Sequence, residues 1–249
     1  MYRYALTIEY DGSPFHGWQV QNSITTVQGV VFDAIKKLDM NCENLVGAGR
    51  TDAGVHAIGQ VAHVDLATKR DCETVQKAIN YYLNKYPVSI LNARLVNNQF
   101  HARFSAIKRH YIYKIFSRKT DLTFEKNQYW HVRHSLNKSN MQLAANYLTG
   151  RHDFSAFRSS ICQASSPIKT IDKISIHSEE IRDGVVYQLN FSARSFLHHQ
   201  VRSIVGCLEK VGCGKWGAKK IQEILLSKDR SRCAALAPSG GLYLARIDY

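Results

Sequence analysis

The order of hydrophobic patterns along the chain constrains its fold most, because it begins strand, helix, strand, strand, helix, strand. In Tyr2–Tyr10 apolar and polar side chains alternate with the two-residue period of a half-exposed strand. Residues 24–38 repeat apolar side chains every three or four positions, which predicts a helix with Ser23, Thr25 or Thr26 as its N-cap. The same patterns predict strands at 45–48, 60–66 and 88–96 and a helix at 73–84.

The second half of the chain repeats this order of elements. We predict strands at 111–116, 171–177, 185–193 and 242–247, and helices at 141–148, from near Phe196 onward, and at 218–226. Two split βαβ units with mostly antiparallel sheets would give a pseudo-symmetric α/β protein of the α+β type, with a cleft between its halves. We place the halves at residues 1–104 and 105–249, joined without a Pro-rich or Ser-rich linker.

The charge of the chain indicates a polyanionic partner. Lys and Arg outnumber Asp and Glu by 33 to 20, a formal net charge of +13. Such a surplus favours RNA or DNA, although many proteins are basic for solubility alone. No apolar run has the length of a membrane span and the N-terminus does not resemble a signal peptide, so we expect a cytoplasmic protein without membrane attachment.

The cysteines and histidines do not follow the spacings of known metal sites. None of the six cysteines is paired at the short spacing of a zinc knuckle, and no HExxH motif occurs. His198 and His199 are expected on different sides of a helix, which is poor geometry for chelation. We therefore predict that the protein holds no metal.

The Gly-rich segment VGAGRTDAGVHA, Val46 to Ala57, is the strongest candidate for chemistry. Its glycines could cradle a phosphate, but no Lys followed by Ser or Thr comes after them, and a strand pattern follows where a helix is needed. The segment also offers a carboxylate, Asp52, which an adjacent Arg50 would keep ionised as a nucleophile. An aspartate between Thr and Gly is also common as a turn residue, so both interpretations stay open on pattern alone.

Several blocks in order along the chain resemble one family. GRTDAGVHA at Gly49–Ala57 is similar to the signature of the pseudouridine synthases, specifically the family of the bacterial tRNA pseudouridine synthase A. The resemblance continues in EYDGSPFHGWQVQ, FHARFSAIKRHYIY, DFSAFR, FLHHQVRSIVG and GLYL, which begin at residues 9, 100, 153, 196 and 241.

The resemblance implies a reaction and a role for the Gly-rich segment. Members of this family detach uracil from ribose at N1 and rejoin it through C5, without metal or organic cofactor. Asp52 would be the nucleophile, attacking either uracil C6 or ribose C1′. Arg50 would fill the space of the flipped-out uridine, and because flipping costs a few kcal/mol, a side chain in the gap is physically sensible.

The other blocks imply further site residues. Tyr111 would stack on the uracil and assist proton transfer, although an inward-facing strand tyrosine would give the same pattern. Arg202 would pair with the catalytic aspartate, the alternative being a solvated helix charge, and Leu242 would line the uracil pocket. The residues expected to contact RNA are Arg50, Phe100, His101, Arg103, Phe104, Tyr111, Arg158 and Leu242.

The resemblance also implies a substrate and an assembly. Relatives modify positions 38 to 40 in the anticodon arm of tRNA and act as homodimers, so we expect tRNA as partner, a homodimer, and an RNA-binding cleft between the halves. Two other functions stay open. One is a tRNA-binding or folding protein without catalysis, which the charge alone would explain, and the other is a phosphate-dependent enzyme that uses the glycines to bind an anion.

Overall fold

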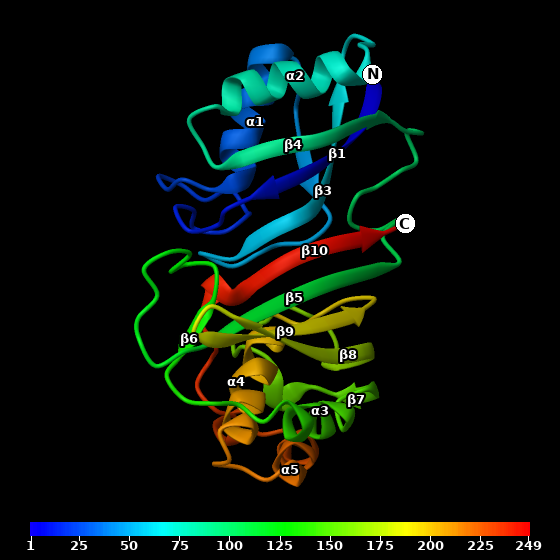
Figure 1. The fold of residues 1–249 in the computed structure, drawn as a ribbon. Helices are drawn as coiled ribbons and strands as arrows, with labels where there is room; N and C mark the ends of the chain where they lie inside the picture. Colours follow the sequence, from blue (N-terminus) through cyan, green and yellow to red (C-terminus); the bar gives the residue numbers. More distant parts are fainter. The chain divides into compact units, whose positions relative to one another are not determined.

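The computed structural model describes all 249 residues and divides them into two compact units (Figure 1). Unit 1 comprises Met1–Ile107 and Tyr243–Tyr249, and unit 2 comprises Lys108–Leu242. The break after Ile107 lies three residues beyond the boundary expected from the sequence, and the last strand, expected in the second half, groups with unit 1. None of the helices has the length and the apolar run that crossing a bilayer requires.

Unit 1 is a mixed α/β unit with strands in the order β4-β1-β3-β10, and β2 pairs with β3. The pairs β1–β3, β1–β4 and β2–β3 are antiparallel, whereas β10 runs parallel to β3. The helices α1 and α2 pack against each other, and α2 lies against β4 (Figure 1). The elements are β1 (Tyr2–Tyr10), α1 (Val27–Leu38), β2 (Leu45–Gly47), β3 (His56–Leu66), α2 (Cys72–Leu83), β4 (Val88–Leu95) and β10 (Leu242–Asp248).

Local sequence explains why these elements form. In β1 the residues Tyr4, Leu6 and Ile8 share one face and are fully buried, as the alternation predicts. Thr26 is the N-cap of α1, and its side chain accepts a hydrogen bond from the N–H of Gly29. Asp71 caps α2 in the same way. The sequence left three candidates for the cap of α1, and the structure selects the last of them.

Unit 2 has strands in the order β5-β9-β8-β7, all antiparallel, with β6 parallel to β5. The helices α3 and α4 pack together, α3 lies against β8, and α5 contacts α3 (Figure 1). The elements are β5 (Lys108–Ser117), β6 (Trp130–Val132), α3 (Lys138–Asn146), β7 (Gly150–Asp153), η1 (Ser155–Phe157), β8 (Ile168–Ile181), β9 (Gly184–Ala193), α4 (Gln200–Gly212), α5 (Lys219–Ser227), η2 (Arg230–Arg232) and η3 (Ser239–Gly241).

The predicted fold class, a mixed α/β protein with mostly antiparallel strands, is confirmed. The sequence did not indicate β6 and β7, which have three and four residues and are too short to show a period. The helix expected from Phe196 begins only at Gln200, because His199 has a φ of 65° and lies in the left-handed region. The cleft expected between the halves stays a prediction.

Candidate active site

The Gly-rich segment forms a tight loop between β2 and β3 of unit 1. The N–H of Ala48 donates to the carbonyl of Val61 over 2.8 Å, and the Gln60 amide donates to the Gly49 carbonyl over 2.7 Å. Asp52 is half-buried and opens a turn that the N–H of Val55 closes by donating to the Asp52 carbonyl over 3.1 Å. The turn therefore fixes the backbone that carries the carboxylate.

The segment before α1 holds this loop from one side. The N–H of Trp18 donates to the Thr51 carbonyl over 3.0 Å, and the N–H of Gly54 donates to the Phe15 carbonyl over 3.2 Å. Gly17 has a φ of +89°, and a Cβ there would lie 2.6 Å from the Thr51 carbonyl oxygen. The block EYDGSPFHGWQVQ therefore packs with its backbone directly against the Gly-rich loop.

Two buried polar pairs fix the loop further. The hydroxyls of Tyr10 and Thr51 lie 2.8 Å apart and share a hydrogen bond, and Thr51 is 7% exposed. The buried ring of His56 accepts a hydrogen bond at Nδ1 from the N–H of Gly12 over 3.0 Å, and it stacks on Tyr243. Buried polar groups with satisfied partners keep one conformation, since breaking them leaves an uncompensated donor or acceptor.

Arg50 lies two residues before Asp52 on the same loop, and it is exposed. The predicted nucleophile and the predicted base-displacing residue therefore lie on one hydrogen-bonded loop. A second segment of unit 1 carries Phe100, His101, Arg103 and Phe104.

This second segment presents an aromatic group with a cation beside it. The ring of His101 lies 4.4 Å from that of Phe104, and the guanidinium of Arg103 lies 5.6 Å from the Phe104 ring. Phe104 is 75% exposed, which is unusual for a phenylalanine. Phe100 instead packs against the ring of Tyr249. Exposed rings next to arginine suit base stacking, and the expected RNA contact of this segment stays a prediction.

The tyrosines of the YIY run in unit 2 differ in their surroundings. Tyr111 on β5 is half-buried and meets the ring of Phe196 edge-on at 5.2 Å. Tyr113 is fully buried and donates from its hydroxyl to the Pro238 carbonyl over 2.7 Å. Burial raises the pKa of Tyr113 far above its usual range. Only Tyr111 therefore has the accessibility that substrate contact requires.

Arg202 lies on the third position of α4 and is half-buried, which disfavours the solvated helix charge that the sequence left open. Its Nε donates to the Ala237 carbonyl over 2.8 Å. Its positive charge acts to lower the pKa of Tyr113, against the larger effect of burial. Leu242 is 6% exposed.

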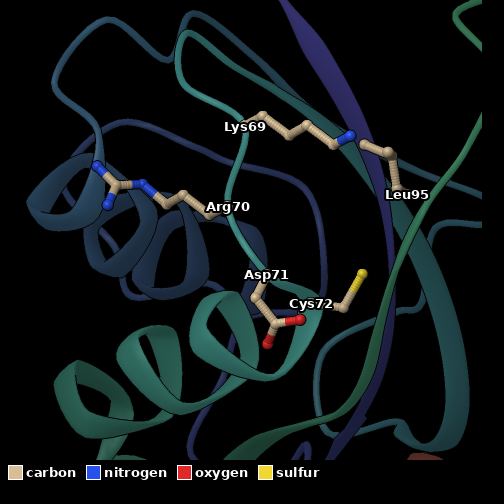
Figure 2. Close-up of a pocket in the computed structure, with 5 residues that line it drawn as sticks. All are labelled: Lys69, Arg70, Asp71, Cys72 and Leu95. Atoms are coloured by element: carbon tan, nitrogen blue, oxygen red, sulfur yellow. The ribbon is translucent and has the colours of Figure 1, made fainter.

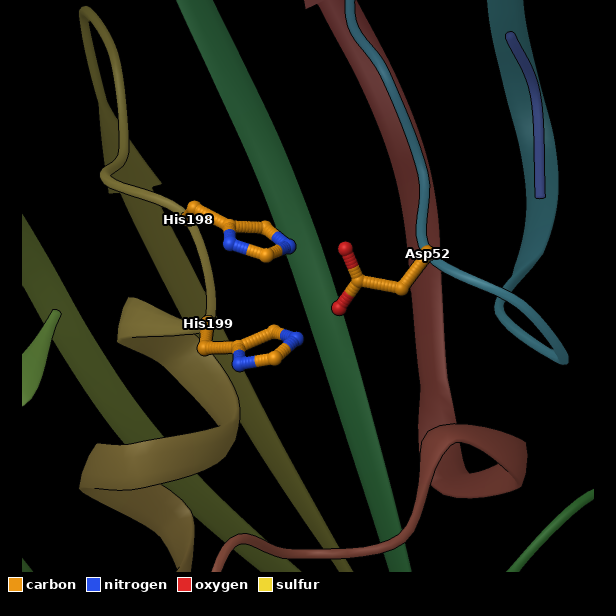
Figure 3. Close-up of side chains that lie close together, drawn as sticks. All are labelled: Asp52, His198 and His199. Carbon is orange, nitrogen blue, oxygen red and sulfur yellow. The ribbon is translucent and has the colours of Figure 1, made fainter. Parts of the chain in front are cut away.

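The remaining unit 2 residues complete the comparison with the sequence. Arg158 follows η1 and is half-buried. His198 and His199 were expected on different sides of a helix, which is wrong: they precede α4, and their ring centroids lie 3.9 Å apart. Figure 3 shows both rings on the segment that leads into α4, and Asp52 on its own loop. The pairing of Asp52 with Arg202 stays a prediction.

Unit 1 also has a surface pocket, which other residues line. Lys69, Arg70, Asp71, Cys72 and Leu95 line it, at the start of α2 (Figure 2). The Asp71 carboxylate is engaged with the N–H groups of the first turn of α2. None of the predicted site residues belongs to this pocket.

The sequence matches the family described as "tRNA pseudouridine synthase" over residues 6–105 and 144–249. Similar curated proteins cover the whole chain. The tRNA pseudouridine synthase A of Maricaulis maris is 49% identical, with all of this chain and 98% of that protein aligned. Those of Xanthobacter autotrophicus and Parvibaculum lavamentivorans are 48% and 49% identical, with both chains covered completely.

Proposed function

Because this chain belongs to the tRNA pseudouridine synthase family, whose members are isomerases, we propose that it converts uridine to pseudouridine at positions 38 to 40 in the anticodon arm of tRNA. The observation that carries the proposal is the half-buried carboxylate of Asp52 on a turn fixed by backbone and buried side-chain hydrogen bonds. A turn aspartate with only a local role would not need so many supports.

In the proposed reaction Asp52 is the nucleophile, at either uracil C6 or ribose C1′. The bond from ribose C1′ to N1 breaks, the uracil turns, and a bond from C1′ to C5 forms. The bond made by Asp52 breaks again and frees the carboxylate, while C5 loses its proton and N1 gains one, so the product is an isomer of uridine. A carboxylate suits this role only when ionised, and the charge of Arg202, which arginine keeps at all accessible pH values, would maintain that state. Tyr111 would stack on the base and assist removal of the C5 proton.

Arg50 would take the place of the target uridine in the RNA stack. Its exposed position on the same loop as Asp52 supports this role, since one movement of the RNA would bring both residues to the nucleotide. Arg103, Phe104 and Arg158 would contact the RNA around the site. We also propose that the protein acts in the cytoplasm and that it is a homodimer. Light scattering on the purified chain tests the oligomeric state.

The proposal is tested by tritium release from tRNA labelled at uracil C5. Asp52→Asn should abolish release while the melting temperature and tRNA affinity change little, because the amide is the same size as the carboxylate. Asp33→Asn, at an exposed position of α1, is the matched control and should keep full activity. Release by Asp52→Asn at the wild-type rate would contradict the nucleophile assignment.

The site of modification and the role of Tyr111 need separate measurements. Pseudouridine mapping in tRNA from cells with and without the gene should show losses confined to positions 38 to 40. Tyr111→Phe keeps the ring and removes the hydroxyl, so it should lower the rate more than tRNA affinity. Tyr81→Phe, at a position 70% exposed on α2, should change neither.

The second candidate function, a tRNA-binding protein without catalysis, rests on the net charge of +13. It predicts tight tRNA binding and no tritium release by the wild-type protein. The presence of a fixed carboxylate in the loop favours the enzyme.

A further inference from the structure

Three side chains with different donor atoms meet in unit 2, outside the proposed active-site residues. They are His134, Glu209 and Cys213, which we call the α4 cluster. One donor atom from each lies within 4.8 Å of the other two, and His134 Nε2 lies 2.8 Å from Glu209 Oε1. His134 is on the segment between β6 and α3, Glu209 is on the last turn of α4, and Cys213 is the C-cap residue that follows Gly212.

The spacing on α4 suits chelation. Glu209 and Cys213 are four residues apart, so their side chains project from the same face of the helix, one turn apart. Helical ligand pairs in metalloproteins use the same spacing. His134 is 75 positions earlier in the chain than Glu209, which is why cysteine and histidine spacings could not indicate the cluster.

Glu209 is the unusual member of the cluster. It is 2% exposed, and a buried carboxylate is costly unless cations or hydrogen bonds compensate it. Its Oε1 faces His134, while Oε2 has no hydrogen bond of good geometry and lies 2.9 Å from the ammonium of Lys210. The side chains of His134 and Lys210 are 47% and 32% exposed. Both side chains therefore reach the buried carboxylate from the solvent side and have room to move.

We propose that His134, Glu209 and Cys213 bind one divalent transition metal ion of the zinc type. An imidazole nitrogen, a carboxylate oxygen and a thiolate sulfur are the donors that zinc prefers. At zinc–ligand distances of about 2.0–2.3 Å the donors of a tetrahedral site lie roughly 3.5 Å apart, so the cluster would change by about 1 Å. Water would be the fourth ligand, on the side where His134 is exposed.

Binding would rearrange charges without leaving a buried charge unpaired. The Cys213 thiol, which now donates to the Lys210 carbonyl over 3.5 Å, would lose its proton to solvent. Thiolate and Glu209 carboxylate together neutralise the ion, and the half-exposed Lys210 side chain would turn to water. The ion would tie the His134 segment to α4, next to the bond from the Asn137 N–H to the Gly212 carbonyl.

Cobalt(II) tests the proposal directly, because a cobalt–thiolate bond gives a charge-transfer absorption that His and carboxylate ligands do not. The full chain, without added histidines and freed of metal by chelator, should gain this band at one cobalt per chain and lose it when zinc is added. Cys213→Ser should remove the band. Cys233→Ser, at another half-buried cysteine of unit 2, is the matched control and should keep it.

A second readout covers the case in which Cys213→Ser does not fold. His134→Asn changes a side chain that is 47% exposed, and it should weaken cobalt binding at least tenfold. At the same concentration zinc should raise the melting temperature of the wild type by more than that of His134→Asn. No thiolate band in the wild type, or a band that survives Cys213→Ser or disappears in Cys233→Ser, would overturn the proposal and leave the α4 cluster as an ion pair only.

Discussion

Replacing Gly17 by alanine should damage the Asp52 loop. Gly17 has a φ of +89°, where a residue with a Cβ costs roughly 1–2 kcal/mol. The new Cβ would also lie 2.6 Å from the Thr51 carbonyl oxygen and 3.1 Å from the Asp52 carbonyl carbon. These are backbone atoms that cannot rotate away, and overpacking of this kind costs about 1–3 kcal/mol. We therefore expect Gly17→Ala to lower the free energy of unfolding by about 2–5 kcal/mol.

Gly214→Ala separates the two causes. Gly214 also has a positive φ, +78°, but no atom lies within 4 Å of its added Cβ. Gly214→Ala should therefore lower the free energy of unfolding only by the roughly 1–2 kcal/mol that the positive φ costs a residue with a Cβ. Urea unfolding of both variants measures the difference, and the tritium-release assay should show a large loss for Gly17→Ala alone, at a temperature where it is folded. Equal destabilisation of the two variants, with full activity in Gly17→Ala, would refute the reasoning.

Three further outcomes follow from single groups. Burial first, and then the charge of Arg3, lowers the pKa of His63 from 6.5 to about 4, a gap that corresponds to about 3 kcal/mol. As pH drops, the unfolded chain binds the proton before the folded chain does, so the free energy of unfolding should fall from about pH 6.5 to about pH 4. Urea midpoints measured across this range should fall less for His63→Gln than for the control His177→Gln. Tyr113→Phe should cost about 0.5–1.5 kcal/mol in urea unfolding, since it removes the part-buried hydrogen bond to the Pro238 carbonyl; an unchanged midpoint would contradict this. Affinity for tRNA should fall roughly a hundredfold or more between about 50 and 200 mM salt, measured by filter binding, if several phosphates are contacted.

Much of the fold could be predicted because hydrophobic periods are local. The alternation in β1 and the three-to-four spacing in α1 depend only on which face is buried, and the structure has both elements close to the predicted bounds. The start of α4 could not be predicted, since nothing in a period indicates a left-handed φ at His199. The same residue explains why the two histidines lie together although a continuing helix would separate them.

The sequence also could not predict which distant segments pair with each other. The strand β10 runs parallel to β3, with Tyr243 opposite His56, although 187 positions separate these residues. The hydrophobic period of β10 predicts a strand but does not indicate which sheet the strand joins. We assigned it to the second half from its position in the chain alone. The α4 cluster has the same origin, because its members become neighbours only when the segment before α3 meets the end of α4.

For the candidate site, the sequence singled out the GRTDAGVHA segment, but it could not show which contacts most of its residues make. Thr51 bonds to Tyr10, Gly54 holds a φ of +74° and donates to Phe15, and His56 accepts from the segment before α1. These residues of the GRTDAGVHA motif make hydrogen bonds within unit 1. Arg50 and Ala53 are exposed instead, and Asp52 between them is half-buried. The motif is therefore mostly a support for one short turn. Because a carboxylate reacts well only when its position is fixed before the substrate arrives, substitutions at Thr51 or His56 should act on catalysis through the position of Asp52, with no contact of their own to RNA.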